Sequence, residues 1–581
     1  MERFNFRVFR RFWAIAKSYW FGDEKWKARG LLVLLVILLL GYTGLSVVLN
    51  NKRGVLISAL SSKDEARFWE TVLIFIGVLV AYAPLLGGYD YLQKRVGVEW
   101  RRWLTGRFVD DYFTDRSFYE IQQFKTDIDN PDQRIAEDVR NFTQESLAFL
   151  LVVAGSVLQV IAFSGVLWGI SSNLVWFLVL YALLGTLITV FIFGKPLVRL
   201  NFEQLKKEAN FRFSLVRIRE NAEAIAFYRG EAQEASQVKN RFMEAFDNFK
   251  KLIFWELNLN TLTNAYEFIP FVLPAIVVAP AVFAGDIEVG KVTEAQGAFV
   301  RVFFSLNVVV ARFQSLTSFG AGIDRLFDFA EALDHVESEH LESEDLEETC
   351  SDKEGEQPQH PVISVETGEP IALQNFTLQT PNYKRTLVED LSLELPEQKG
   401  LLIVGPSGCG KSSLLRAIAG LWNSGSGTLQ RPGLDHMLFL PQKPYMVMGR
   451  LRDQLLYPDT DQEVDEADLK EALKQVNLAD LDERFGGFNA VEDWGDVLSL
   501  GEQQRLTFAR ILLNRPDFAI LDEATSALDL ANEAKLYDHL QHTGTTYISV
   551  GHRESLNQYH QNILELGEDH TWRLRALTSV G

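Results

Sequence analysis

The clearest chemistry in the sequence belongs to a glycine-rich stretch, GPSGCGKSS, at residues 405–413. It fits the pattern G-x-x-x-x-G-K-[ST], whose backbone N–H groups wrap around phosphates. Lys411 would bring positive charge to the β- and γ-phosphates, and the Ser412 hydroxyl would ligate Mg²⁺. An apolar run at 401–404 and a helix-like run at 413–421 predict a strand and a helix that position the loop, with the helix dipole favouring the phosphates. The predicted nucleotide contacts are Gly405, Pro406, Ser407, Gly408, Cys409, Gly410, Lys411, Ser412 and Ser413.

Two further strand ends carry residues suited to nucleotide hydrolysis. The stretch FAILDE, 518–523, is an apolar strand that ends in Asp522 and Glu523. Asp522 would hold Mg²⁺, and Glu523 would polarise the attacking water. The stretch YISVGHR, 547–553, is a strand followed by His552, which would contact the γ-phosphate. Together these positions predict an ATP-hydrolysing enzyme that uses ATP and Mg²⁺.

Composition narrows the class of protein. The formal net charge of the 581 residues is −20, which disfavours nucleic acid as a partner. An acidic tract at 335–356 is typical of a solvated linker. The two cysteines, Cys350 and Cys409, fall in that tract and in the glycine-rich loop, so no disulfide framework is indicated.

Long apolar runs fill the first half of the chain and predict six membrane-spanning helices, each of roughly twenty residues. They lie at 31–49, 72–91, 147–170, 174–197, 262–283 and 295–310. The segment before the first span is rich in Arg and Lys, which places the N-terminus in the cytoplasm, and six crossings return the second half there. Residues 4–20 mix Arg with Phe and Trp, as an interfacial helix does. The long connections after the second and fourth spans are expected to be helical.

Polar residues within the expected spans indicate a path for a solute. Glu256, Asn260, Asn264 and Glu267 recur at helical spacing in and just before the fifth span. Arg301 lies in the sixth span, and ionisable residues inside spans are usually functional. Glu294 and Arg312 share one face of the sixth helix with Arg301. A water-filled translocation path is the functional interpretation, and simple solvation at the cytoplasmic helix ends is the alternative for Glu256 and Arg312.

The segment VLSLGEQQRLTFAR, 497–510, is similar to the ABC-family signature, usually spelled LSGGQ. With the phosphate loop, Asp522, Glu523 and His552 in this order, the whole chain resembles an ABC half-transporter of the exporter-type fold. The resemblance implies a homodimer that sandwiches two ATP molecules. In it, Ser499 and Gly501 contact the γ-phosphate held by the other subunit, and Asp529 lies at the dimer interface. Gln442 contacts Mg²⁺ and senses the membrane domain.

The position that stacks on adenine in many exporters is Thr380 here. Tyr383, three residues later, is the expected substitute.

Finer stretches resemble subfamily D and bacterial relatives with a SbmA/BacA-like membrane domain. They are NPDQRIAEDVR (130–140), RENAEAIAFYRGE (219–231), GLW (420–422), GRLRDQLLYP (449–458) and SVGHR (549–553). The segment LSLGEQQR resembles the variant spelling of the signature in that group. The group implies cobalamin, peptides or other bulky hydrophilic solutes, or long-chain fatty acids and their CoA esters, as transported solutes.

These observations predict the following organisation: an α-helical membrane domain with six spans and an N-terminal interfacial helix at 1–332, an acidic linker at 333–360, and an α/β P-loop ATPase domain at 361–581. The partners expected are a second copy of the chain, the lipid bilayer and the solute. We expect a multi-pass protein of the bacterial plasma membrane with its ATPase domain in the cytoplasm, and the resemblance leaves a eukaryotic organelle membrane open as the alternative. Two alternatives stay open: an ABC protein that gates or regulates a membrane partner without pumping, and, less compatible with six spans, a soluble ABC ATPase.

Overall fold

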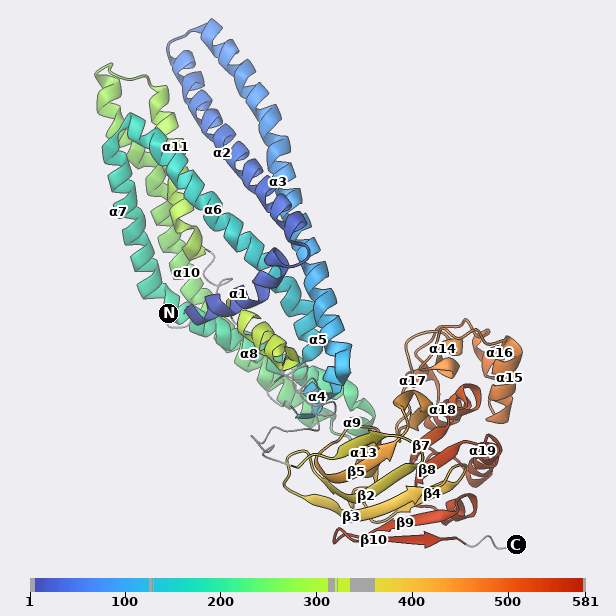
Figure 1. Cartoon of the computed structure of the whole chain (residues 1–581). Helices are drawn as coiled ribbons and strands as arrows, with labels where there is room; N and C mark the ends of the chain where they lie inside the picture. The colour runs from blue at the N-terminus through green and yellow to red at the C-terminus, as the bar shows by residue number, and fades with distance from the viewer. Residues whose placement is uncertain are drawn as a thin grey trace, which may run out of the picture. The chain divides into compact units, whose positions relative to one another are not determined.

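The computed structural model describes residues 6–124, 128, 130–311, 319–320, 322–334 and 361–577. The chain divides into two compact units, Met1–Ser351 and Asp352–Gly581, which are labelled by element in Figure 1. Of the expected linker at 333–360, only Leu333 and Asp334 are among the described residues. The acidic tract itself lies outside them, so its boundaries stay a prediction.

The first unit is built from helices. In chain order they are α1 (Phe6–Phe21), α2 (Lys25–Ser61), α3 (Glu65–Phe113), η1 (Thr114–Arg116), α4 (Ser117–Phe124), α5 (Pro131–Gln133), η2 (Arg134–Asp138), α6 (Val139–Ile170), α7 (Ser172–Ile188), η3 (Thr189–Gly194), α8 (Lys195–Glu220), α9 (Ala222–Tyr228), α10 (Glu231–Phe283) and α11 (Gly290–Ala311). Residues 322–334 are also helical.

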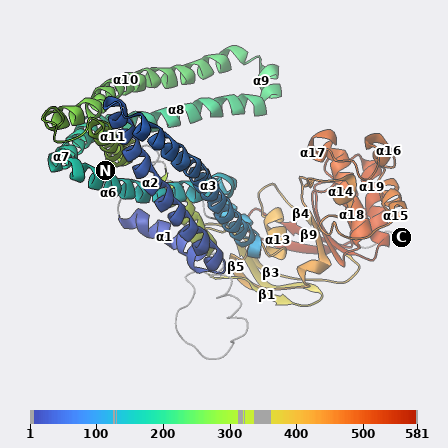
Figure 2. The same cartoon turned by 90° about the horizontal axis from the view of Figure 1, so that it is seen from above.

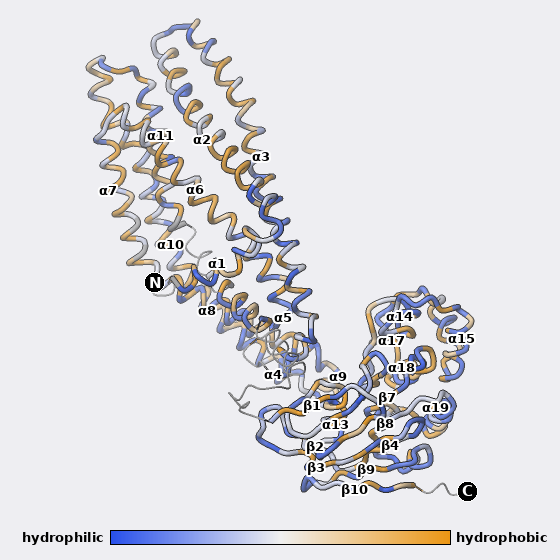
Figure 3. Tube along the Cα trace, in the orientation of Figure 1, coloured by the Kyte–Doolittle hydropathy of each residue, from blue (hydrophilic) through white to orange (hydrophobic). Residues whose placement is uncertain are grey.

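Among the described residues, four helices are long and apolar enough to cross a membrane. They are Lys25–Ser61, Glu65–Gln123, Pro131–Ile170 and Glu231–Phe283, and they contain the expected first, second, third and fifth spans. Hydrophobic positions run along these helices in Figure 3. The fourth expected span lies on α7, the π-helical η3 and the start of α8, and the sixth lies on α11. Neither meets the same length and composition criteria, so six crossings remain a prediction.

Close backbone contact joins α2 to α11. A Cβ atom added at Gly290 would overlap the Gly54 carbonyl oxygen, and the Gly290 N–H donates to the Ser58 hydroxyl at 3.0 Å. Asn51 donates to the Glu294 carboxylate at 3.0 Å, and Lys291 pairs with the same carboxylate at 2.7 Å. Small residues let membrane helices approach closely, and polar side chains then bridge them. The contact therefore fixes α2 against the start of α11.

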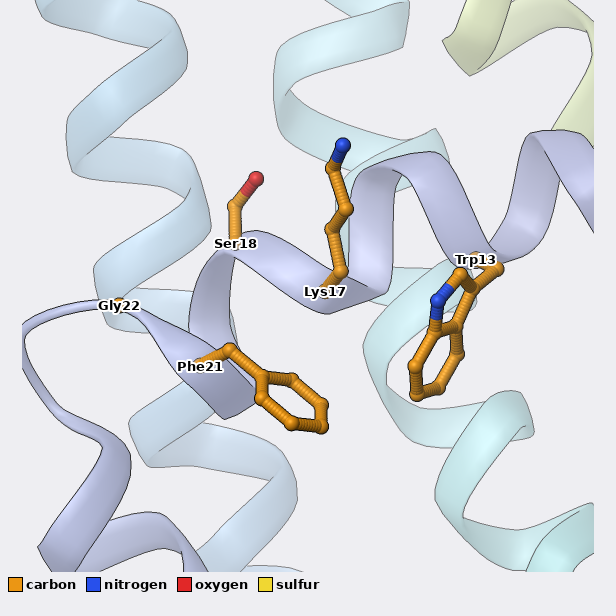
Figure 4. A pocket seen from close by; sticks show the side chains of 5 residues that line it. All are labelled: Trp13, Lys17, Ser18, Phe21 and Gly22. Atoms are coloured by element: carbon orange, nitrogen blue, oxygen red, sulfur yellow. The ribbon is translucent and has the colours of Figure 1, made fainter.

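Helix α1 is amphipathic. Ile15 and Tyr19 are buried, whereas the side chains of Trp13 and Phe21 are 45% and 57% exposed. Figure 4 shows Trp13 and Phe21 projecting to one side of the helix and Lys17 to the other, and with Ser18 and Gly22 they line a shallow hollow. A helix in a membrane interface typically presents exposed aromatic rings on one side and basic residues on another.

The two long connections are helical, as their sequences predict. After the second span, α3 continues to Phe113 and is followed by α4 and α5. After the fourth, α8 and α10 run side by side and α9 joins them at their far end (Figure 2). Both connections therefore prolong the membrane helices rather than forming open loops.

The second unit contains two sheets. The four-stranded sheet has the order β1-β5-β2-β3, from Ser364–Thr367, Gly425–Arg431, Ile371–Gln379 and Thr386–Leu395. The six-stranded sheet has the order β10-β9-β4-β8-β7-β6, from Trp572–Ala576, Asn562–Leu566, Gly400–Val404, Thr546–Val550, Phe518–Asp522 and Met437–Leu440. The helices are α13 (Lys411–Ile418), α14 (Leu451–Leu456), α15 (Glu466–Gln475), α16 (Leu481–Phe485), α17 (Trp494–Val497), α18 (Leu500–Asn514) and α19 (Leu530–His542), with the short η4 (Leu434–His436) and η5 (Glu554–Tyr559).

Strands β9, β4, β8, β7 and β6 are parallel neighbours, and β10 pairs antiparallel with β9. Leu402 packs into one buried cluster, while Leu401 and Ile403 pack into another. A strand buried on both faces needs an apolar run rather than an alternating pattern, and β4, β7 and β8 have such runs. The parallel strands bring their carboxyl ends to one edge, which is where this class of sheet binds ligands.

Candidate nucleotide-binding site

The phosphate loop connects β4 to α13, as the sequence predicts. Gly405, Gly408 and Gly410 have positive φ values of 153°, 81° and 106°. A Cβ atom at Gly405 would overlap the Leu566 carbonyl oxygen, so this glycine also permits a close backbone contact. Pro406, Ser407 and Gly408 are exposed, Cys409 and Gly410 are buried, and Ser413 is half-buried in the first turn of α13. The loop thus presents its exposed backbone ahead of a helix N-terminus, where phosphates bind.

Lys411 is buried, but its ammonium group is hydrogen-bonded. The Nζ atom donates to the carbonyl oxygens of Gly405 at 2.9 Å and Pro406 at 2.8 Å. The side chain therefore folds back over the loop that it follows. It places a positive charge where the loop backbone would hold a phosphate.

Ser412 and Asp522 come together across adjacent elements. The Ser412 hydroxyl donates to Asp522 Oδ1 at 3.0 Å. Burial raises the pKa of Asp522, and the Ser412 hydrogen bond only partly opposes that effect. A half-buried carboxylate and a hydroxyl are hard oxygen donors of the kind that Mg²⁺ prefers.

Glu523 lies between two other predicted site residues. Gln442 Nε2 donates to Glu523 Oε2 at 2.8 Å, and His552 Nε2 lies 3.3 Å from Glu523 Oε1. Glu523 itself has a φ of 47°, a left-handed backbone conformation that non-glycine residues seldom adopt. Strained backbone of this kind is common at functional sites. The three side chains come from the ends of β6, β7 and β8, so the sheet edge assembles them.

Tyr383 lies on a tight turn between β2 and β3. Its backbone N–H donates to the Thr380 carbonyl at 2.7 Å, and its φ is 55°. Arg385, on the same turn, donates to the Gly408 carbonyl at 3.4 Å. The turn that carries Tyr383 is thereby attached to the phosphate loop.

The signature-like segment begins helix α18. Ser499 is the N-cap, and Glu502 in the first turn accepts hydrogen bonds from the Ser499 backbone N–H and hydroxyl, both at 2.8 Å. Burial works to raise the pKa of Glu502, but the Ser499 hydrogen bonds and the Arg484 guanidinium outweigh it and hold that pKa below its usual range. Gly501 packs beside Ala527. No hydrogen bond between described residues joins Ser499 or Gly501 to the phosphate loop of the same chain.

Asp529 is the N-cap of α19 and accepts a hydrogen bond from the Asn532 backbone N–H at 2.7 Å. That hydrogen bond is the largest cause of the lowered pKa of Asp529. The carboxylate therefore serves the start of α19 within this chain.

Arg553 and Gln504 are structural partners of the site that the sequence did not reveal. Arg553 donates to the carbonyl oxygens of Leu528 at 2.8 Å and Ser526 at 3.0 Å. The side-chain amide oxygen of Gln504 accepts from the Ala527 backbone N–H at 3.0 Å. Both side chains hold the segment just before Asp529. The stretch SVGHR contains Arg553, but the sequence does not indicate which backbone carbonyl groups its side chain contacts.

Fold and site together define a P-loop ATPase attached to a helical membrane domain. Residues 16–283 match the family "ABC transporter transmembrane region 2", and residues 388–526 match the family "ABC transporter". An uncharacterized ABC transporter ATP-binding protein of Synechocystis is 45% identical over 96% of this chain and 83% of its own length. ABC transporter D family member 2, chloroplastic, of Arabidopsis thaliana is 38% identical over 98% of this chain and 88% of its own.

The lysosomal cobalamin transporter ABCD4 of Homo sapiens is 31% identical over 99% of this chain and 97% of its own length. The chain belongs to the ABC transporter family and, within it, to the D family. It is a multi-pass membrane protein in which an ATP-binding, ATP-hydrolysing domain is coupled to transport.

Proposed function

We propose that the chain is a half-transporter that works as a homodimer and moves a bulky solute by alternating access. The observation that carries this proposal is Glu523, which is oriented at the sheet edge by Gln442 at 2.8 Å and His552 at 3.3 Å. A carboxylate held from two sides is suited to orienting the water that attacks a γ-phosphate. A protein that only gates a partner has no need of this arrangement.

The other side chains of the site complete the hydrolytic chemistry. Lys411 balances charge on the β- and γ-phosphates, and His552 donates to the γ-phosphate while it contacts Glu523. Ser412, Asp522 and Gln442 would hold Mg²⁺, which neutralises phosphate charge when it is bound. Tyr383, on the turn attached to the phosphate loop, would stack on adenine.

The proposal of a dimer rests on the signature-like segment, 497–510. Ser499 and Gly501 would contact the γ-phosphate of ATP held on the phosphate loop of the other subunit, with Asp529 beside that interface. Helix α18 starts at Ser499, so its N-terminal dipole would face the anion. Two copies of the chain would enclose two ATP molecules.

The deciding experiment is ATP hydrolysis by the purified protein in lipid. Glu523→Gln should lower turnover by a factor of about a hundred or more, because it removes the group that accepts the proton from water. Lys474→Ala changes an exposed lysine that pairs with Glu471 and serves as the matched control. Absence of any turnover that depends on Glu523 would contradict the pump and favour the gating alternative.

Polar side chains on three helices would line the solute path. Arg301 on α11 is exposed, and its guanidinium carbon lies 6.0 Å from the Phe163 ring centre on α6. Ser305, one turn later, donates to Gln159 on α6 at 3.1 Å, and Tyr42 on α2 interacts with that amide. No ion pair joins Arg301 to a carboxylate among the described residues. A charged side chain at such a position is costly against lipid, which favours a water-filled path.

The solute is one of the classes the resemblance implies: cobalamin, a peptide or other hydrophilic compound, or a long-chain fatty acid or its CoA ester. The human relative is named as a cobalamin transporter, which supports cobalamin among these classes. Uptake into sealed vesicles should be compared for cobalamin, an antimicrobial peptide and an acyl-CoA. Arg301→Ala should weaken stimulation of ATP hydrolysis by the transported solute about tenfold, and unchanged stimulation would contradict the path.

The membrane in question is proposed to be the bacterial plasma membrane, with the ATPase domain in the cytoplasm. Bacterial relatives that match over 83% and 93% of their own length support this location. The domain boundaries at 332 and 360 belong to the same proposal.

A further inference from the structure

An acidic side chain occupies the first turn of the signature helix. Glu502 accepts from the Ser499 hydroxyl and backbone N–H, and the Glu502 N–H reaches the Ser499 hydroxyl at 3.4 Å. This reciprocal capping box fixes both the start of α18 and the direction of the Ser499 hydroxyl. The hydroxyl that would face the γ-phosphate in the proposed dimer is thereby bonded to a carboxylate.

The carboxylate creates an electrostatic problem for ATP. A helix N-terminus favours an anion, but a second anion at the same place opposes it. The Glu502 side chain is only 17% exposed, so water screens its charge less than it would at an open surface. A γ-phosphate that approached Ser499 would meet this negative charge within one helical turn.

Arg484 supplies a positive charge that compensates the negative charge of Glu502. Its Nη1 atom lies 2.8 Å from Glu502 Oε1, on the carboxylate oxygen that Ser499 does not use. The two oxygens of Glu502 are thus divided between Ser499 and Arg484. The ion pair thus offsets the negative charge of Glu502 beside the signature serine.

Arg484 is held in place by the end of α16. Its guanidinium carbon lies 4.9 Å from the Phe485 ring centre, and that ring packs edge-on against Trp494. The Trp494 indole donates to the Gly449 carbonyl at 2.9 Å. A guanidinium fixed by stacking loses less conformational entropy on pairing than a free surface side chain does.

We propose that Arg484 is a positioning residue for ATP hydrolysis: it masks the charge of Glu502, so that Ser499 can engage the γ-phosphate of ATP bound to the second copy of the chain. The proposal rests on the proposed homodimer and deepens it. It assigns a role to a residue 15 positions before the signature serine and outside the predicted site. Arg484 itself acts through Glu502 and is not expected to touch the nucleotide.

The test is a double-mutant cycle on the full-length protein in lipid, with ATP as the probe. Arg484→Ala should raise the ATP concentration for half-maximal hydrolysis about fivefold at low salt, because it unmasks a charge worth roughly 1 kcal/mol. The effect should shrink at high salt, where the charge is screened. In the Glu502→Gln background, the same Arg484→Ala change should alter that concentration less than twofold, because no charge remains to mask.

Controls separate this role from simple stabilisation. Lys474→Ala removes an exposed positive charge from the neighbouring helix α15 and should leave the ATP dependence unchanged. Arg484→Lys retains a charge and should be milder than Arg484→Ala. The proposal would be overturned if Arg484→Ala raised the ATP concentration for half-maximal hydrolysis equally in both backgrounds. It would also be overturned if that rise did not depend on salt, or if there were no rise at all. If the parent protein itself shows no Glu523-dependent hydrolysis, the proposed function fails instead, which is a distinguishable result.

Discussion

The two units of this chain use polar side chains in different ways. In the ATPase unit, side chains from separate elements bond to each other, as Gln442 after β6 does to Glu523 after β7, and Ser412 on α13 to Asp522 on β7. In the membrane unit, many bond to backbone carbonyls: the Tyr181 hydroxyl donates to the Tyr266 carbonyl at 2.8 Å. A lipid environment offers no water to satisfy backbone groups, so helices and their own side chains must do so. Chemistry is therefore concentrated in one unit, and close helix packing governs the other.

The largest effect that tests this contrast is expected at the α2–α11 contact. Gly290→Leu should abolish transport and lower the melting temperature of the purified protein by about 10 °C, because the new side chain would collide with Gly54 and Ser58. Melting in detergent and vesicle uptake would measure both effects.

Gly87→Leu is the matched control. It lies on α3, and a Cβ atom there meets no heavy atom within 4 Å. Equal tolerance of Gly87→Leu and Gly290→Leu would contradict the view that packing dominates the membrane unit.

A smaller effect is expected from Arg553→Ala in the ATPase unit. The change removes hydrogen bonds to Leu528 and Ser526 and leaves the buried Glu533 carboxylate without its guanidinium partner. Turnover should fall about tenfold, with a loss of roughly 1–3 kcal/mol in stability. Steady-state kinetics and denaturant titration would measure these quantities.

Arg553→Lys keeps the charge but not the forked geometry, so it should recover only part of the activity. A fully active Arg553→Ala protein would show that the segment before Asp529 is positioned without this side chain.

The smallest expected effect is a pH-dependent change in melting temperature when Asp522 is replaced. Burial raises the pKa of Asp522, so its contribution to stability is full below the usual carboxyl range and is lost as pH rises through the raised pKa. Asp522→Asn should therefore melt on the order of a few degrees higher than the parent at neutral pH without nucleotide, and this gain should disappear in acid. Hydrolysis should be lost in the same variant.

Asp569→Asn should change stability at neutral pH in the opposite direction to Asp522→Asn. A hydrogen bond from Thr571 is the largest cause of the lowered pKa of Asp569, so neutralising that group should cost a little stability at neutral pH. A pH-independent difference between Asp522→Asn and the parent would count against the burial argument.

The strand ends that carry the expected ATPase residues are easy to recognise in the sequence, whereas the chemical roles of those residues stay predictions. The loop after β4, Asp522 at the end of β7 and His552 after β8 are where the apolar runs place them. Parallel pairing then brings these ends together without further information. The contact of Gln442 with Glu523 joins residues 81 positions apart and follows from the same sheet edge.

The other features of the fold and the site depend on contacts between elements that a sequence pattern does not predict. Arg484 meets Glu502 only because α16 folds beside the start of α18, and a charge pair 18 residues apart has no sequence signature. Apolar runs identified four long membrane helices, but the fourth expected span is divided among α7, η3 and α8. The contact of Gly290 with Gly54 was not foreseen, because a glycine in a helix does not reveal its neighbour.

The bonds that Lys411 makes to Gly405 and Pro406 have a consequence for turnover. A phosphate oxygen that reaches the ammonium must compete with two carbonyl oxygens, so nucleotide capture is an exchange of partners and not a simple gain of one. We expect the ammonium to return to the same two carbonyl oxygens when the product leaves. This return would offset part of the contact that is lost with the phosphate, and it would weaken the retention of ADP.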